Sequence, residues 1–211
     1  MTAYTCSFCE EFNLGYLKLN SKVFRRILYE SKNFIVVPSL GHFIDGYLLI
    51  LPKKHFICIG EIPFRLYDEL EFVISKCKEV LFKAYRKRTI LFEHGAVGNS
   101  LKEKAGCCKD HAHLHIVPIE INLFNEISKN YHFKKITSFL SLKSNFIKKI
   151  PYLFYENNEG ERYLFNAPLV VSQYFRKILA KRLNKLKLWD WRSHPEIKNL
   201  QRTLKKLRSY F

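Results

Sequence analysis

Three histidines, His111, His113 and His115, alternate with small or apolar residues in the segment His-Ala-His-Leu-His. Side chains at alternate positions of a β-strand point to one face, so this spacing predicts three imidazoles side by side. Imidazole titrates near neutral pH, binds metals and can attack electrophiles. The segment is therefore the leading candidate for a catalytic site. The alternatives are a structural metal site or core histidines that are satisfied by hydrogen bonds.

A pair of cysteines near the start of the chain, Cys6 and Cys9, has the C-x-x-C spacing. This spacing occurs in zinc half-sites and in redox pairs, and it also arises by accident. Structural zinc takes four ligands, and no second C-x-x-C follows, so the other two would be histidines or distant cysteines. His55, which follows Leu-Pro-Lys-Lys, and His111 are the candidates.

The apolar pattern ahead of the histidine segment predicts short strands and one long helix. Apolar residues recur at spacings of three and four from Ile62 to Ala84, which is typical of an amphipathic helix. Apolar runs predict strands at 24–29, 33–37, 46–52 and 89–93, followed by a loop over 95–110. Together with the histidine strand, these elements predict an α+β fold with a mostly antiparallel sheet and one long helix.

The amino-acid composition changes beyond Glu120, where basic residues become frequent. We expect a helical segment over 124–150, a hairpin over 151–165, and two closing helices, one from about Ser172 and one over 197–207. The predicted division is therefore a first domain over 1–121 and a mixed hairpin and helical, basic C-terminal extension over 122–211 that packs on it.

Composition bounds the class of protein. The chain has 211 residues, of which 47% are hydrophobic and 18 are Phe, so a sizeable core is expected. No segment approaches the roughly 20 apolar residues of a membrane span, and the first residues lack signal-peptide features, so we expect a cytoplasmic protein without a membrane partner. The net charge of +17 favours either a polyanionic partner such as nucleic acid or a solvated basic surface.

The sequence resembles the histidine triad (HIT) family of nucleotide hydrolases and transferases. The resemblance covers roughly residues 4–120 and is carried by the histidine segment and by the apolar strand that ends in Pro-Lys-Lys-His about 55 residues earlier. It implies a HIT-like fold and, through the C-x-x-C, the zinc-bearing branch of the family. The implied structural zinc would be held by four residues, Cys6, Cys9, His55 and His111.

The resemblance also implies roles for the three histidines. His113 would attack the α-phosphorus of a nucleotide and form a nucleotidyl-imidazole, and His115 would donate hydrogen bonds to the phosphate oxygens. His111 would orient the segment through zinc. The implied substrates are dinucleoside polyphosphates, nucleoside phosphoramidates or a nucleotidyl adduct, with water as the acceptor in a hydrolase and phosphate or a sugar phosphate in a nucleotidyltransferase.

Three positions depart from the family pattern, and the first two are candidates for substrate binding. Glu93 stands in the region where the family commonly has Asn or Gln, and Cys108 stands where a hydroxyl residue is frequent. Tyr47 occupies a position that is often His. In the extension, Gln173 and Arg176 lie three residues apart, so a helix would bring them to one face and towards the phosphates.

Two other functions remain open at this stage. The basic extension favours a HIT enzyme that processes nucleic-acid ends by deadenylation or decapping, and the departures at Tyr47 and Glu93 favour a non-catalytic, zinc-stabilised basic binding module. The resemblance implies a homodimer in many members, although the extension could cover the usual dimer face.

Overall fold

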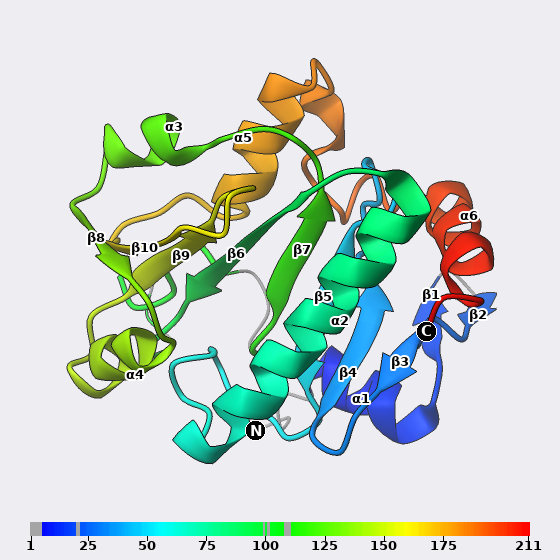
Figure 1. Cartoon of the computed structure of the whole chain (residues 1–211), viewed down its shortest axis with the longest axis horizontal. Coiled ribbons are helices and arrows are strands. Elements are labelled where there is room, and N and C mark those ends of the chain that lie inside the picture. Colours follow the sequence, from blue (N-terminus) through cyan, green and yellow to red (C-terminus); the bar gives the residue numbers. More distant parts are fainter. Residues whose placement is uncertain (1–5, 20–21, 99, 101, 108–110) are drawn as a thin grey trace.

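An eight-stranded antiparallel sheet with helices on both faces forms the protein in the computed structural model, which describes residues 6–19, 22–98, 100, 102–107 and 111–211 (Figure 1). The strand order is β3-β4-β5-β7-β6-β9-β10-β8. These strands are β3 (Tyr29–Glu30), β4 (Phe34–Pro38), β5 (Leu48–Pro52), β6 (Thr89–Gly95), β7 (Leu114–Pro118), β8 (Phe133–Ile136), β9 (Tyr152–Glu156) and β10 (Arg162–Asn166). A separate hairpin pairs β1 (Leu17–Leu19) with β2 (Lys22–Phe24).

The helices of the described residues cover the sheet and its edges. They are α1 (Ser7–Leu14), α2 (Tyr67–Tyr85), α3 (Phe124–Ser128), α4 (Leu140–Ile147), α5 (Tyr174–Arg182) and α6 (Ile197–Leu207), with 3₁₀ turns η1 (Phe64–Leu66) and η2 (Leu186–Leu188). None of them is long and apolar enough to cross a membrane. The α+β prediction with a mostly antiparallel sheet is confirmed.

The central strands are buried on both faces, which explains why their sequences are continuous apolar runs rather than alternating ones. In β5, Leu48 and Ile50 belong to the core beneath α2, whereas Leu49 and Leu51 belong to the core on the opposite face, which includes residues of α1 and α5. Side chains that alternate along one strand thus serve two separate cores.

The long helix follows its predicted pattern. α2 starts at Tyr67, after the 3₁₀ turn that follows Pro63, and its apolar positions are buried against the sheet. Arg86 ends it in a left-handed conformation, with its N–H bonded to the carbonyl of Phe82. The start lies later than Ile62 because Pro63 has extended backbone angles.

The C-terminal part continues the sheet. The hairpin predicted over 151–165 is confirmed as β9 and β10. The helical prediction for 124–150 is wrong in its middle, because β8 separates α3 from α4 and pairs with β10 at the sheet edge. β9 in turn pairs with β6 over five positions, from Leu91↔Glu156 to Gly95↔Tyr152. The division into residues 1–121 and 122–211 stays a prediction, and the strands after 121 extend the same sheet.

This arrangement positions the histidine segment. β7 lies between β5 and β6, and His115 faces Leu49 on one side and Phe92 on the other. Those three residues share the face that carries α1 and α5. Side chains of α1 and of α5 therefore pack on the face of the sheet that also carries His115.

Candidate functional site

Four predicted metal ligands lie together. Cys6 precedes the first turn of α1, and Cys9 lies on that turn. The ligand atoms of Cys6, Cys9, His55 and His111 all lie within 4.8 Å of one another. Cys6 Sγ lies 3.4 Å from His111 Nδ1, Cys9 Sγ lies 3.4 Å from His55 Nδ1, and Cys9 Sγ lies 3.6 Å from His111 Nδ1.

The donor set and its spacing fit zinc. Zn–S bonds of about 2.3 Å and Zn–N bonds of about 2.0 Å in a tetrahedron separate sulfur from nitrogen by about 3.5 Å, and the three S···N distances agree with this separation. The other nitrogen of His111, Nε2, donates to the carbonyl of Pro52 at 2.9 Å, so Nδ1 presents its lone pair to the sulfurs. Burial and the adjacent Cys6 raise the pKa of the Cys9 thiol to about 11, an effect that a bound dication would reverse.

His113 is held by its own backbone. Its Nδ1 lies 2.6 Å from the carbonyl oxygen of His111, which can only accept a hydrogen bond. Nδ1 therefore carries the proton, and in the neutral ring Nε2 carries the lone pair. Phe8 of α1 packs against the ring at a centroid distance of 6.0 Å. This arrangement fixes the tautomer that a nucleophilic imidazole needs.

His115 is set by two aromatic neighbours. The Tyr47 hydroxyl lies 2.8 Å from its Nδ1, and the ring of Phe92 stacks on it with centroids 4.5 Å apart. Burial, and then the nearby His113, lower the pKa of His115 well below its usual value, so the ring is neutral at physiological pH. When the Tyr47 hydroxyl donates to Nδ1, the proton of His115 resides on Nε2, where it can donate to a ligand.

The expectation that all three histidines lie on one strand is wrong, because only His115 lies within β7. β7 begins only at Leu114, so His111 and His113 precede it. The N–H of Ala112 bonds instead to the carbonyl of Phe56, and the carbonyl of His111 accepts from its own neighbour His113. The rings of His113 and His115 remain together at 4.8 Å, whereas His111 is edge-on to His55 at 5.1 Å in the cysteine cluster.

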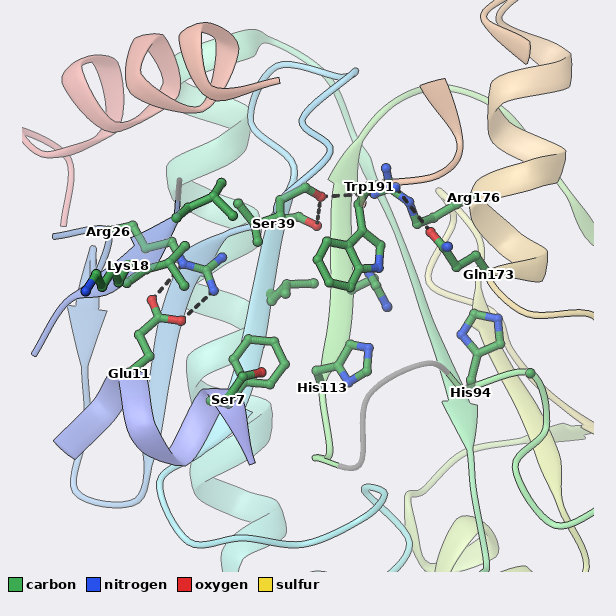
Figure 2. A pocket seen from close by; sticks show the side chains of 17 residues that line it. Ser7, Glu11, Lys18, Arg26, Ser39, His94, His113, Gln173, Arg176 and Trp191 are labelled. Atoms are coloured by element: carbon green, nitrogen blue, oxygen red, sulfur yellow. Dashed lines mark hydrogen bonds and ion pairs between the residues drawn. The ribbon is translucent and has the colours of Figure 1, made fainter. Parts of the chain in front are cut away.

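A cavity of about 210 Å³ opens beside His113 and His115 (Figure 2). Residues from α1, the β1–β2 hairpin, the sheet and the C-terminal part line it, so its walls come from both ends of the chain. They are Ser7, Phe8, Glu11, Leu17, Lys18, Leu19, Arg26, Ser39, Leu40, Leu49, His94, Gly106, His113, His115, Gln173, Arg176 and Trp191.

Arg176 of α5 lines this cavity and is 3% exposed. Its guanidinium donates to backbone carbonyls, including that of Gly41 at 2.7 Å and that of Trp189 at 2.8 Å. Gly41 permits this approach, because it has φ +66° and a Cβ there would lie 2.3 Å from Nη2 of Arg176. Among the described residues, no carboxylate lies within ion-pair distance of Arg176. A buried cation whose partners among the described residues are carbonyls and the rings of Phe43 and Tyr47 favours an anion in the cavity.

Gln173 also lines the cavity, immediately before α5, with a left-handed backbone at φ 60°. Its amide donates to Asp190 at 3.0 Å, which ties the start of α5 to the Trp-Asp-Trp segment. Gln173 and Arg176 therefore both line the cavity, although Gln173 precedes the helix and does not share a helix face with Arg176. Their role as phosphate ligands stays a prediction.

Glu93 lies outside the cavity, which corrects its expected place beside a phosphate. It points to the opposite face of β6 and is 2% exposed, where it accepts from the N–H of Ile59 at 2.6 Å and from the Tyr152 hydroxyl at 2.9 Å. Burial raises the pKa of Glu93 to about 7. Cys108 falls outside the described residues.

Four features in or beside the cavity were not among the predicted site residues. His94 lines the cavity from β6, on the face opposite to Glu93. Tyr47, which immediately precedes β5, does not line the cavity but contacts His115 through its hydroxyl. A buried ion pair, in which Arg26 donates twice to Glu11 at 2.7 Å, lines the end near α1. The fourth is Trp191. The strand alternation of β6 could have found His94, because it shares a face with Phe92.

Comparison with known proteins gives one curated relative and several solved structures. The chain is 28% identical over 116 residues to an uncharacterized HIT-like protein from Methanocaldococcus jannaschii, a match that covers 54% of this chain and 78% of the relative. No protein-family model matches the chain.

Three of the similar solved structures are described as histidine triad proteins. A HIT family protein from Bacillus anthracis is 22% identical, covering 56% of this chain and 74% of that one, with a TM-score of 0.44. A histidine triad nucleotide-binding protein from Sulfolobus tokodaii is 21% identical, covering 68% and 91%, with a TM-score of 0.44. A zinc-bound histidine triad protein from Mycobacterium smegmatis is 17% identical, covering 68% and 94%, with a TM-score of 0.42.

Proposed function

Because this chain belongs to the histidine triad family, we propose that it is a nucleotide hydrolase or nucleotidyltransferase that works through a nucleotidyl-His113 intermediate. The observation that carries the proposal is the 2.6 Å hydrogen bond from His113 Nδ1 to the carbonyl of His111. It leaves Nε2 as the basic nitrogen of the ring, at the edge of a cavity that contains a buried cation.

The reaction has two displacement steps. His113 Nε2 forms a bond to the α-phosphorus, and the bond from phosphorus to the leaving group breaks with its electron pair going to that group. An oxygen of water, phosphate or a sugar phosphate then forms a bond to phosphorus, and the bond from Nε2 breaks with its electron pair returning to the ring. When water attacks, its proton is released and neutralises the departed group. Because a histidine phosphoramidate is labile, both steps are accessible at neutral pH.

The charge that develops on the phosphoryl oxygens is balanced by fixed groups. His115 donates from Nε2 when Tyr47 holds its Nδ1, and Arg176 supplies a positive charge. Fixed donors in a site shielded from water stabilise a transition state more than mobile donors do, because they need no reorganisation.

The walls of the cavity suit a nucleoside. Leu17, Leu19, Leu40, Leu49 and Trp191 present apolar surface to it. Apolar walls with a few polar groups are typical of sites for small organic ligands. The nucleoside would therefore lie between α1 and the Trp191 segment, with its phosphate towards His113.

Zinc fits the cluster of Cys6, Cys9, His55 and His111 and is proposed as a structural ion. When bound it supplies a cross-link between α1 and the start of the histidine segment. His111 thereby holds the carbonyl that fixes the tautomer of His113.

Nucleic-acid ends are a second candidate substrate. α6 presents exposed basic residues, including Lys198, Lys205 and Lys206. Binding to a polynucleotide would weaken steeply with added salt, because counterions are released on association. An absence of DNA and RNA binding at low ionic strength would remove this candidate.

The test of the proposed function is turnover of a fluorogenic nucleoside phosphoramidate. We expect His113→Ala to lower kcat by about a thousandfold or more, as loss of a nucleophile does. His132→Ala serves as the matched control, because His132 is exposed outside the cavity. Equal turnover by the His113→Ala variant would overturn the mechanism, and no turnover by the wild-type protein would favour a binding module.

A further inference from the structure

A fourth histidine, His94 on β6, lines the same cavity as His113 and His115. It is 6% exposed, and its Nε2 has no hydrogen-bond partner among the described residues. Buried polar atoms in folded proteins nearly always have a partner, and leaving one without costs about as much as a lost hydrogen bond. A partner from outside the chain is therefore expected at this nitrogen.

The strand register places His94 beside the proposed nucleophile. Phe92 of β6 lies opposite His115 of β7 in an antiparallel pair. His94 lies two positions after Phe92 on β6 and shares its face. Because the pair is antiparallel, the position opposite His94 on the neighbouring segment is two residues before His115, which is His113. Figure 2 shows His113 and His94 on adjacent segments, with Gln173 and Trp191 above them.

The His94 ring is held in place by packing. Phe175 of α5 meets it edge-on at 5.2 Å, and His115 lies edge-on at 6.3 Å. Burial, and then the nearby His113, lower the pKa of His94 to about 3. The ring is therefore neutral at physiological pH and offers one N–H donor.

Distance favours the α-phosphoryl group as the partner. A nucleophile and the phosphorus it attacks approach to about 3–3.5 Å before reaction, and neighbouring strands are about 4.8 Å apart. A phosphoryl group on His113 thus extends oxygens towards the side chain on the next strand, and neutral His94 lies on that side.

We propose that His94 is a further catalytic residue, whose Nε2–H donates a hydrogen bond to a non-bridging oxygen of the α-phosphoryl group while His113 attacks. This inference rests on the proposed function. His94 keeps its proton throughout, and its part is to stabilise the charge that develops on that oxygen. With His115 and Arg176 it gives the oxygens donors from three different elements.

Two substitutions at this position separate chemistry from packing. His94→Phe keeps a ring against Phe175 and removes both nitrogens, and His94→Gln restores a donor. We expect His94→Phe to lower kcat/KM for a nucleoside phosphoramidate by about tenfold to a hundredfold. This loss is at or below the range of about a hundredfold to a thousandfold that removal of one transition-state donor causes. His94→Gln should recover most of the loss, and the exposed control His132→Phe should have no effect.

Binding provides a readout that does not depend on turnover. For His94→Phe we expect Kd to rise for a nucleoside monophosphate and to stay within twofold for the corresponding nucleoside. An equal loss for both ligands, or kcat/KM within twofold of wild type, would overturn the role of His94. A wild-type protein that neither binds the monophosphate nor turns over would instead overturn the proposed function itself.

Discussion

The two ends of the histidine segment differ sharply in what surrounds them. At the His111 end, the ligand atoms of Cys6, Cys9, His55 and His111 all lie within 4.8 Å of one another. At the His115 end, the imidazoles face a cavity that also contains the buried guanidinium of Arg176. At the His111 end the groups contact one another. At the His115 end, among the described residues, Arg176 has carbonyl partners but no carboxylate, and the buried Nε2 of His94 has no hydrogen-bond partner.

This difference shows that spacing alone does not assign a role to a histidine. The three histidines have the same spacing in the sequence, but their neighbours differ. Cys6 and Cys9, at the start of α1, lie beside His111. Arg176 of α5 lines the cavity together with His113 and His115. A hydrogen bond between them connects the two regions, because the carbonyl of His111 fixes the ring of His113.

Removing the metal ligands should have the largest effect on the protein. We expect Cys6→Ser/Cys9→Ser to lose about one zinc per chain and to lower the free energy of unfolding by several kcal/mol, because metal binding and folding are coupled. Metal analysis and urea unfolding measure this. Cys77→Ala is the control. Cys77 is fully buried in the core beneath α2, so its replacement should lower the stability and leave the zinc content unchanged. Zinc retained by the double variant would assign the metal to the histidine segment.

A buried histidine outside both regions should make stability depend on pH. His42 donates from Nδ1 to the carbonyl of Ser39 at 3.2 Å, and its Nε2 accepts from Thr203 of α6 at 2.7 Å. Burial lowers its pKa from 6.5 to about 4, with smaller effects from Asp45, Arg176 and Arg202.

The lowered pKa of His42 determines how stability changes with pH. The folded state favours neutral His42, so its contribution is complete above pH 6.5 and is lost as the pH falls towards 4, at about 1.4 kcal/mol per pH unit and about 3 kcal/mol at most. His42→Asn should flatten the slope of unfolding free energy measured between pH 7 and 5, and His132→Asn should not. An unchanged slope in His42→Asn would contradict this account of His42.

Arg176 should matter for the phosphate and not for the nucleoside. We expect Arg176→Met to weaken binding of a nucleoside monophosphate by about tenfold to a hundredfold, because a charged hydrogen bond or a close ion pair contributes roughly 1.5–3 kcal/mol. Calorimetric titration with monophosphate and with nucleoside measures the difference. The exposed Arg192→Met is the matched control. Parallel losses for both ligands would mean that Arg176 only supports the fold through Gly41 and its neighbours.

Tyr47 should have the smallest effect. Tyr47→Phe removes the hydroxyl that lies 2.8 Å from His115 Nδ1 and keeps the ring. We expect kcat to fall by about tenfold, equivalent to one hydrogen bond, while the zinc content stays unchanged. Steady-state kinetics and metal analysis check both parts, and an unaltered kcat would show that His115 does not need this partner to hold its tautomer.

The sequence predicts those parts of the molecule that local pattern and motif determine. The long helix, the β9–β10 hairpin and the proximity of Cys6, Cys9, His55 and His111 all follow from spacing or from resemblance. Arg176 lines the cavity, and its carbonyl partner Gly41 lies far away in the sequence; its contact with a phosphate stays a prediction.

Long-range strand pairing accounts for what the sequence misses. β6 was expected to end at Glu93, but pairing with β9 extends it to Gly95 and makes His94 a strand residue that faces the cavity. β8 is a strand for the same reason, since its partner β10 lies about 30 residues further along the chain (Arg162↔Ile136 to Phe165↔Phe133). Local propensity carries no information about such partners.

The central claim is that His113 becomes covalently attached to the nucleotide. The most direct measurement is peptide mass spectrometry after a nucleoside phosphoramidate reaction is quenched in alkali, which preserves phosphoramidates. The account predicts the added mass of one nucleoside monophosphoryl group on the peptide that contains His113, and its absence in His113→Ala. An adduct that persists in His113→Ala, or that maps to another residue, would contradict it.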